Sequence, residues 1–175
     1  MFNYQIIIEY LGTDFAGWQI QKNGSSIQSH IQRALSKLLK SKIKIIGSGR
    51  TDAGVHAKGQ SANFFLKKEI KNKHKFLNSI NFFLKKKSIS IIKINRKKKN
   101  FHARHNVKKK IYKYIILNRL TNSPIYNGRV WFIKNKLNLI KMKKGIRYYL
   151  GTHNFTAMRA ASCAAISPIR TISKA

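Results

Sequence analysis

The sequence predicts an α+β fold of two ferredoxin-like units of the β-α-β-β-α-β type with antiparallel sheets, the second of them incomplete. Strand-like and helix-like segments follow one another in this order over the first half of the chain. A run of basic residues at 96–100 lacks apolar periodicity and marks a boundary between a domain at 1–98 and a domain at 99–175. After this boundary the pattern supports only one helix and a few strands, which predicts a poor independent core.

The elements of the first unit are defined by their apolar spacing and turn residues. A strand at 3–11 has isoleucines between polar positions, and a turn at 12–14 closes it. Ser25 or Ser26 is a suitable N-cap for an amphipathic helix, because apolar residues recur after it at helical spacing. These residues are Ile27, Ile31, Ala34, Leu35 and Leu38. The remaining elements are a strand at 42–46, a glycine-rich loop, a strand at 60–66, a helix at 72–84 and a strand at 88–94.

The second unit has weaker signals. Alternating residues predict a strand at 110–118, and a turn region at 124–128 precedes a further strand at 129–133. A helix follows, although a glycine within it lowers its helix propensity. Its residues at helical spacing are Leu137, Ile140, Met142, Gly145, Ile146 and Tyr149. Loop and strand patterns begin at Gly151.

The charge of the chain is extreme: 37 basic and four acidic residues give a formal net charge of +33. Such a surface attracts phosphate backbones or anionic membranes, although the lysine-rich codon usage of an A/T-rich coding sequence explains the charge equally well. Arginine is more informative, because its planar guanidinium binds phosphate and base edges in ways that lysine cannot. The four arginines in the segments least like the lysine-rich background are Arg50, Arg104, Arg159 and Arg170.

Other compositional signals narrow the class of protein. The content of 43% hydrophobic residues is sufficient for a folded core. Since the chain has no apolar run of about 18 residues and no secretory signal at its N-terminus, we expect a cytoplasmic protein without a membrane partner. The single cysteine, Cys163, excludes an internal disulfide framework and a cysteine-rich zinc site.

One acidic residue, Asp52, lies in an unusual place, within the glycine-rich segment 47–54. A dinucleotide fingerprint would require glycine at position 52, and a P-loop would require lysine and serine or threonine where Val55 and His56 stand. From turn chemistry alone, the favoured interpretation is a tight turn in which the glycines adopt positive φ and Asp52 bonds local backbone amides.

The segment from Gly49 to Ala57, with Gly59 and Gln60 after it, resembles the catalytic loop of the tRNA pseudouridine synthase A family. Further blocks in the same order resemble other parts of this family. They are Glu9-Tyr10 with Gly12-Thr13, Phe15 and 17–21; Ile27-Gln28; 101–104; 110–114; and 151–156 with Arg159-Ala160, Ser162-Cys163, Pro168 and 170–172.

The resemblance implies that the protein isomerises uridine to pseudouridine at tRNA positions 38–40 of the anticodon stem-loop. It also implies tRNA as partner, a homodimer and no cofactor. Asp52 would be the catalytic nucleophile, attacking either the base or the sugar. Arg50 would favour the ionised carboxylate by charge pairing and fill the gap left by the flipped nucleotide. Tyr112 would stack on the uracil; without the resemblance, it is expected to be a strand tyrosine in the core.

The histidines and remaining arginines have less specific signals. His102 and His105 have a spacing that suits a metal on a helix, but they lie in an expected extended region without a third ligand, so we expect no metal site. His56 and His153 are expected to fix loops or contact phosphate. The RNA-contact candidates are Arg104, His56, Arg159 and Arg170, since so few acidic partners exist for them.

The family pattern normally continues beyond the equivalent of 170–172, with a strand and a helix that complete the second domain. Only Ser173, Lys174 and Ala175 follow here, which predicts a chain truncated at its C-terminus, with unpaired strand edges in the second sheet. The alternative function is therefore a catalytically inactive, truncated basic RNA-binding remnant.

Overall fold

The computed structural model describes residues 1–159 and 166–175, so Ala160, Ser162 and Cys163, which were part of the resemblance, lie outside the described residues. The chain forms two units, Met1–Tyr112 and Lys113–Ala175, each of which is described by itself. Residues 99–112 belong to the first unit by this division. The domain boundary after residue 98 stays a prediction.

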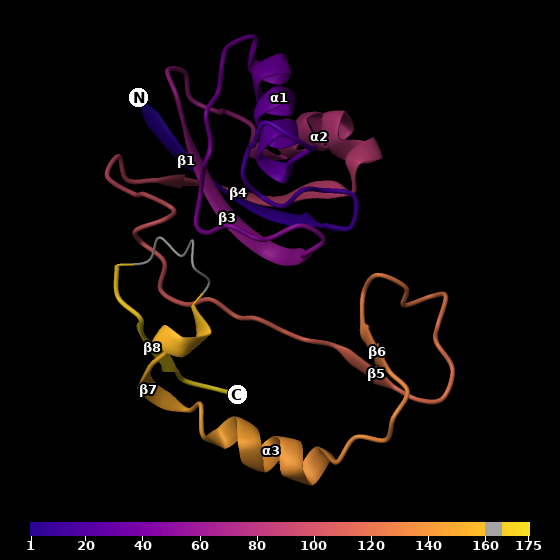
Figure 1. Ribbon diagram of the computed structural model, residues 1–175. Helices are drawn as coiled ribbons and strands as arrows, with labels where there is room; N and C mark the ends of the chain where they lie inside the picture. Colours follow the sequence, from indigo (N-terminus) through magenta and orange to yellow (C-terminus); the bar gives the residue numbers. More distant parts are fainter. Residues whose placement is uncertain (160–165) are drawn as a thin grey trace. The chain divides into compact units, whose positions relative to one another are not determined.

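The first unit contains a four-stranded antiparallel sheet with the strand order β2-β3-β1-β4. Its three long strands, β1, β3 and β4, are labelled in Figure 1. Its elements follow one another in the predicted order β-α-β-β-α-β. They are β1 (Phe2–Tyr10), α1 (Ile27–Leu39), β2 (Ile46–Gly47), β3 (Ala57–Leu66), α2 (Lys73–Leu84), a short 3-10 helix η1 (Lys85–Lys87) and β4 (Ile89–Lys97). β1, the first strand in the sequence, therefore lies between β3 and β4 and pairs with both.

The core lies between this sheet and its two helices. Even-numbered residues of β1 from Tyr4 to Tyr10 are buried, as the period of two in a strand requires. They share one core with Ile27 and Ile31 of α1 and Ile80 of α2, so both helices pack on the same face of the sheet.

Both long helices begin at residues with capping side chains. The Ser26 side chain accepts a hydrogen bond from the backbone N–H of Ser29, which confirms Ser26 as N-cap of α1. The Asn72 side chain accepts from the backbone N–H of Lys75 in the same way at the start of α2. The predicted helix at 72–84 therefore has Asn72 as its cap, and its helical residues begin at Lys73.

The strand predicted at 42–46 is mostly wrong. Only Ile46 and Gly47 pair with β3. The backbone N–H of Ile43 donates to Ser36 Oγ at 2.9 Å, and that of Ile45 donates to Gln32 Oε1 at 2.9 Å. Because side chains of α1 satisfy these donors, the segment buries its isoleucines without entering the sheet.

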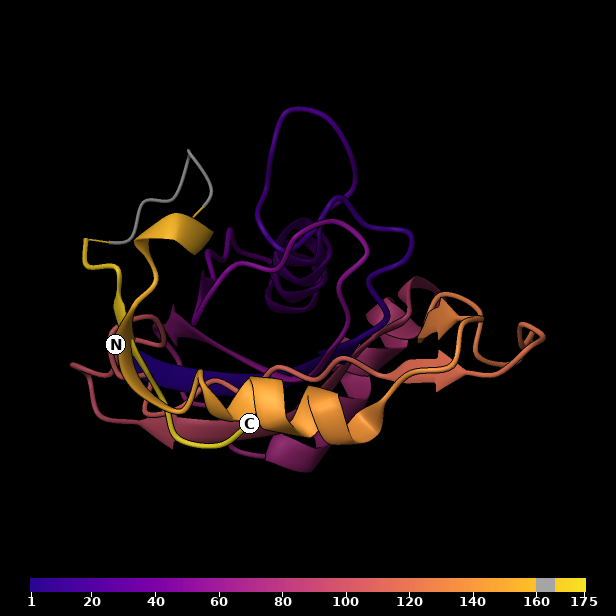
Figure 2. The same cartoon turned by 60° about the horizontal axis from the view of Figure 1, so that its bottom comes forward.

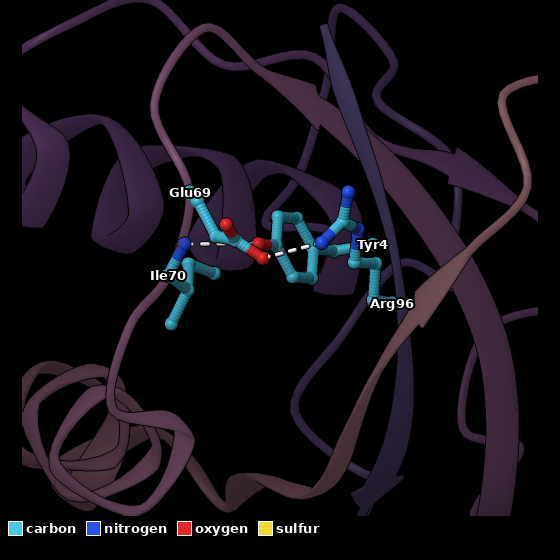
Figure 3. Close-up of polar contacts among 4 residues, drawn as sticks. All are labelled: Tyr4, Glu69, Ile70 and Arg96. Atoms are coloured by element: carbon cyan, nitrogen blue, oxygen red, sulfur yellow. Dashed lines mark hydrogen bonds and ion pairs between the residues drawn. The ribbon is translucent and has the colours of Figure 1, made fainter.

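The loop between β3 and α2 is fixed to the sheet by two polar contacts (Figure 3). Tyr4 Oη accepts a hydrogen bond from the backbone N–H of Ile70 at 2.9 Å, and Arg96 of β4 forms an ion pair with Glu69. The ion pair is about half exposed and contributes at most about 1 kcal/mol. Tyr4 is 1% exposed, so its hydroxyl depends on this one hydrogen bond.

A buried pair of asparagines, Asn3 and Asn63, fixes the chain that follows β4. Asn3 lies on the sheet face opposite the helices, since it alternates with the core residue Tyr4. Asn63 Nδ2 donates to Asn3 Oδ1 at 3.0 Å, and Asn3 Nδ2 donates to the carbonyl of Phe101 at 2.7 Å. The backbone N–H of Ala103 donates to Asn63 Oδ1 at 2.9 Å. This asparagine pair therefore attaches residues 98–103 to the open face of the sheet.

We expect Asn63→Ala to lower the free energy of unfolding by about 2–4 kcal/mol, because the buried N–H of Ala103 and Asn3 Oδ1 would each lose a partner. Denaturation by urea would measure the change. Asn78→Ala, at an exposed position of α2, is the matched control and should change stability by less than about 0.5 kcal/mol. A similar small change in both variants would contradict a stabilising role of the asparagine pair.

The second unit contains two small two-stranded sheets and one helix (Figures 1 and 2). Its elements are β5 (Ile116–Asn118), β6 (Trp131–Ile133), α3 (Leu139–Arg147), β7 (Gly151–Asn154), a 3-10 helix η2 (Thr156–Met158) and β8 (Ile169–Ile172). The strands predicted at 110–118 and 129–133 are shorter than expected. Between 113 and 175, leaving out 160–165, Ser123 is the one buried residue, so the described part has no apolar core.

The pairing of β5 with β6 is parallel, whereas antiparallel sheets were predicted. Residues 119–130 connect the two strands, which is about the length that a crossover between parallel strands requires. The pair β7 and β8 is antiparallel, as predicted. In the described ranges, no helix is long and apolar enough to cross a membrane.

Candidate active site

The glycine-rich segment of the first unit forms a loop, residues 48–56, between β2 and β3; we call it the Arg-Thr-Asp loop. Its start is fixed to the adjoining strand. The backbone N–H of Ser48 donates to the carbonyl of Ser61 at 2.8 Å, and Gln60 Nε2 donates to the carbonyl of Gly49 at 2.6 Å. Both partners belong to β3, so the sheet determines where the loop begins.

A second loop, the 11–18 segment that follows β1, contacts the Arg-Thr-Asp loop along its length. Three hydrogen bonds join the two loops, at the middle, the turn and the end of the Arg-Thr-Asp loop. They run from the backbone N–H of Trp18 to the carbonyl of Thr51 at 2.9 Å, from that of Gly54 to the carbonyl of Phe15 at 3.3 Å, and from that of Gly12 to His56 Nδ1 at 2.8 Å. The two loops therefore form one layer, with donors and acceptors paired between them.

Two glycines of the 11–18 segment permit this close approach. A Cβ on Gly12 would overlap the carbonyl oxygen of Val55. Gly17 has φ +95°, and a Cβ there would lie 2.5 Å from the carbonyl oxygen of Thr51. Both positions therefore require glycine, because any side chain would push the Arg-Thr-Asp loop away.

Thr51, directly before Asp52, is also fixed through its side chain. Tyr10 Oη and Thr51 Oγ1 lie 2.9 Å apart and form a hydrogen bond. Tyr10 is 3% exposed, and its ring centroid lies 6.3 Å from that of Trp18. Burial raises the pKa of the Tyr10 phenol, and the hydrogen bond with Thr51 lowers it by less. The phenol is therefore neutral at physiological pH.

Asp52 itself is exposed, and its carboxylate makes no hydrogen bond or ion pair with the described residues. The expected tight turn is present, because the backbone N–H of Val55 donates to the carbonyl of Asp52 at 3.3 Å and Gly54 has φ +77°. The expected bonds between the Asp52 side chain and local backbone amides are absent from the described residues, so this part of the interpretation is wrong. Arg50 is also exposed and forms no ion pair with Asp52, because Glu69–Arg96 is the one ion pair within the described part of the chain. A backbone with hydrogen bonds at Thr51 and Gly54 thus presents to solvent a carboxylate without a partner among the described residues.

Tyr112 is 76% exposed, so it is not the core tyrosine that its strand-like surroundings predicted. Residues 110–115 form no strand. Lys110 approaches the Arg-Thr-Asp loop, since its Nζ lies 2.8 Å from the position that a Cβ on Gly49 would take. Tyr112 follows two residues later. Within the described residues, its side chain forms no hydrogen bond with Asp52.

The RNA-contact candidates lie in both units. His56 accepts the backbone N–H of Gly12, so it fixes a loop, one of the two roles predicted for it. Arg104 is exposed directly after the buried Ala103. In the second unit, the backbone N–H of Arg159 donates to the carbonyl of Thr156 at 3.1 Å, and Arg170 Nη1 donates to the carbonyl of Ile169 at 2.6 Å.

The histidines outside the loop have local partners. His153 contacts the carbonyl of Leu150 at 2.6 Å, and the rings of His102 and His105 lie 4.3 Å apart. Among residues 1–159 and 166–175, no three side chains of His, Cys, Asp or Glu gather in a way that would bind a metal ion.

Residue patterns did not predict the roles of Tyr10, Trp18 and Gln60. All three were part of the resemblance, but no function followed from their types or spacing. Their contacts with the Arg-Thr-Asp loop span between 11 and 41 residues, and such pairings are not visible in a local pattern. The available signal was the glycines at positions 12 and 17, which indicate close backbone approach.

The chain is similar to known proteins over almost all of its length. Residues 6–106 match the family described as tRNA pseudouridine synthase. The chain is 55% identical to a protein of Pelagibacter ubique named tRNA pseudouridine synthase A over 98% of its own length and 70% of that protein. It is 40% identical to a protein of the same name from Ehrlichia ruminantium, over 97% of the chain and 69% of that protein. The matched region contains the whole Arg-Thr-Asp loop and the 11–18 segment.

Proposed function

The chain belongs to the tRNA pseudouridine synthase family, and from this premise we propose that the Arg-Thr-Asp loop is its active site and Asp52 its nucleophile. The protein is an isomerase that acts on uridine in tRNA. The reaction breaks the bond between uracil N1 and ribose C1′ and forms a bond between C5 and C1′. A proton leaves C5 and N1 gains one, so no oxidant or energy source is consumed.

The single observation that carries the proposal is the unpaired carboxylate of Asp52 on a fixed backbone. A carboxylate can form a covalent intermediate with the base or the sugar and so divide a difficult step into two easier ones. Asp52 meets the geometric requirements, because its side chain is exposed while hydrogen bonds fix Thr51 and Gly54 on both sides of it. No other acidic residue lies in this loop.

Arg50 is proposed to act when the substrate arrives. Its guanidinium is exposed and has no carboxylate partner in the described structure, so it is available to the RNA. We propose that it enters the gap left by the flipped nucleotide and favours the ionised form of Asp52. Arg50→Ala should reduce single-turnover isomerisation, and an unchanged rate would exclude this role.

Tyr112 is proposed to stack on the uracil. Its exposed ring and the approach of Lys110 to Gly49 support a position beside the loop. Stacking on an aromatic ring contributes about 1–3 kcal/mol per base and leaves the base edges free to rotate. Tyr112→Phe should therefore retain activity that Tyr112→Leu loses, and equal activity of both would exclude stacking.

We propose that the substrate uridines lie at positions 38–40 of the anticodon stem-loop, and that Arg104, His56, Arg159 and Arg170 contact the RNA. The formal charge of +33 supports a steep salt dependence of tRNA binding. We also propose that the chain has two ferredoxin-like domains, 1–98 and 99–175, and forms a homodimer. We propose a cytoplasmic location, because tRNA is found in the cytoplasm. The element order of the first unit supports the first domain, and sedimentation equilibrium would contradict a homodimer by giving the mass of one chain.

The expected result of mapping pseudouridine in a transcribed tRNA after incubation with the protein is modification only at positions 38–40. A transcript with cytidine at these positions is the control and should stay unmodified. Modification at other positions would contradict the proposed substrate site. Tight tRNA binding without any isomerisation would instead support the alternative, a catalytically inactive RNA-binding protein.

A further inference from the structure

The end of β1 reaches the residue next to the proposed nucleophile. The register of β1 on β3 shifts between Ile8 and Tyr10, which indicates a β-bulge at this point. Bulges commonly redirect a side chain near an active site. After the shift, Tyr10 pairs with Ala57 of β3 and Ile89 of β4, so strands on both sides fix its backbone.

From this central position Tyr10 contacts Thr51, which is fixed at three points. The hydroxyl of Thr51 forms the hydrogen bond with Tyr10 Oη at 2.9 Å. Its carbonyl accepts from the backbone N–H of Trp18 at 2.9 Å, and Gly17 packs against the same carbonyl. The aromatic rings of Tyr10 and Trp18 lie beside each other. Two of the three contacts to Thr51 therefore come from residues that pack against each other.

We propose that Tyr10 is a positioning residue for isomerisation, which sets the place of Asp52 through its hydrogen bond to Thr51. The inference rests on the proposed role of Asp52 as nucleophile. Tyr10 is buried and makes this contact from the sheet, so it is not expected to touch the substrate.

The physical reason is the absence of any other support for the Asp52 side chain. Its carboxylate has no partner in the described structure, so its location follows from the backbone of residues 51–53 alone. Loss of the Tyr10 hydroxyl would leave Thr51 fixed only through its carbonyl. A misplacement of about 1 Å at a reacting group can reduce a rate by about a hundredfold.

The phenol is well suited to this role because it is always available as a hydrogen-bond partner. Burial raises the pKa of this phenol, so it is protonated at physiological pH. Phenylalanine at position 10 would fill the same space and keep the ring contact with Trp18. Tyr10→Phe therefore removes the hydrogen bond while conserving the packing.

The same strand offers a matched control. Tyr4 is buried on the same face of β1, and its hydroxyl likewise makes one hydrogen bond, to the backbone N–H of Ile70 (Figure 3). Ile70 lies in the loop between β3 and α2, outside the Arg-Thr-Asp loop. Tyr4→Phe thus makes the same chemical change in the same strand without touching Thr51.

The experiment compares kcat and KM of the full-length variants on a tRNA with tritium at uridine C5, since isomerisation releases this hydrogen. Tyr10→Phe should lower kcat by about 10- to 100-fold with KM for tRNA within about twofold. Thr51→Val should have the same effect, the double variant should be no slower than either single variant, and Thr51→Ser should restore most of the rate. Tyr4→Phe should lower the melting temperature while kcat is conserved.

Two results would overturn the inference. One is an unchanged kcat in Tyr10→Phe, and the other is a loss of kcat that is equal in Tyr4→Phe and follows the loss of stability. Asp52→Asn in the same assay separates this inference from the proposed function. If Asp52→Asn is inactive and Tyr10→Phe is normal, only the positioning role fails, whereas a normal rate in Asp52→Asn overturns both.

Discussion

Asp52→Asn is expected to lower the rate of pseudouridine formation by at least about a thousandfold, because it removes the proposed nucleophile and leaves no other acidic residue in the loop. The asparagine side chain has nearly the same shape, and the Asp52 carboxylate has no partner among the described residues whose loss could unfold the loop. The affinity for tRNA should stay within about threefold, since one charge in a strongly basic chain changes the phosphate attraction little. Tritium release and filter binding would measure the two quantities.

Asp14→Asn is the matched control for the change in charge. Asp14 is also an exposed aspartate of the first unit, in the turn after β1, and this variant has the same net charge as Asp52→Asn. It should retain its full rate. An equal loss of activity in both variants would mean that net charge, rather than a reacting carboxylate, determines the rate.

The second large effect is expected for Gly12→Ala, which should reduce kcat by about a hundredfold or more. The added Cβ would overlap the carbonyl oxygen of Val55, and neither backbone can move without breaking a contact. The hydrogen bond from the backbone N–H of Gly12 to His56 Nδ1 would be lost or lengthened at the same time. Because both contacts lie at the end of the Arg-Thr-Asp loop, the change displaces the loop, and single-turnover kinetics would measure it.

Gly59→Ala separates this effect from a general cost of replacing glycine. A Cβ on Gly59 would lie 3.7 Å from Ile7 Cγ2, an ordinary contact distance within the sheet. Alanine in a strand is more stable than glycine by about 0.5–1 kcal/mol, so this variant should be active and slightly more stable. Full activity of Gly12→Ala would show that the two loops move apart without consequence.

The first unit was predictable because its elements have strong local signals. Isoleucines between polar positions indicate β1, and capping residues at Ser26 and Asn72 define the helix starts. The strand at 42–46 could not be predicted correctly, because the partners of its amides are the side chains of Gln32 and Ser36. A pattern of apolar residues shows that a segment is buried but does not show which groups satisfy its backbone.

The second unit was harder to predict because its strands are short and their apolar side chains stay exposed. Trp131 is 61% exposed and Tyr114 is 87% exposed, so alternation there did not reflect two faces of a buried sheet. The direction of β5 against β6 depends on the path of the chain between them, which turn residues do not reveal.

The sequence suggested which residues belong to the candidate site, and their roles stay proposals; it did not reveal which residues support them. Asp52 and Arg50 follow from a motif in consecutive residues, whereas the position of Asp52 depends on Tyr10 and Trp18, which are distant in sequence. The expected pairing of Arg50 with Asp52 also requires side-chain geometry, and the structure does not contain this pair within its described residues.

The central place of β1 has a consequence for how the chain folds during synthesis. This strand leaves the ribosome first, yet its partners β3 and β4 lie at 57–66 and 89–97, and Asn3 bonds to the carbonyl of Phe101. The strand that is synthesised first can therefore complete its pairing only after the last segment of the unit has been synthesised. Such long-range pairing slows folding. We expect pulse-labelled hydrogen exchange to show protection of the β1 amides in the same step as those of β4.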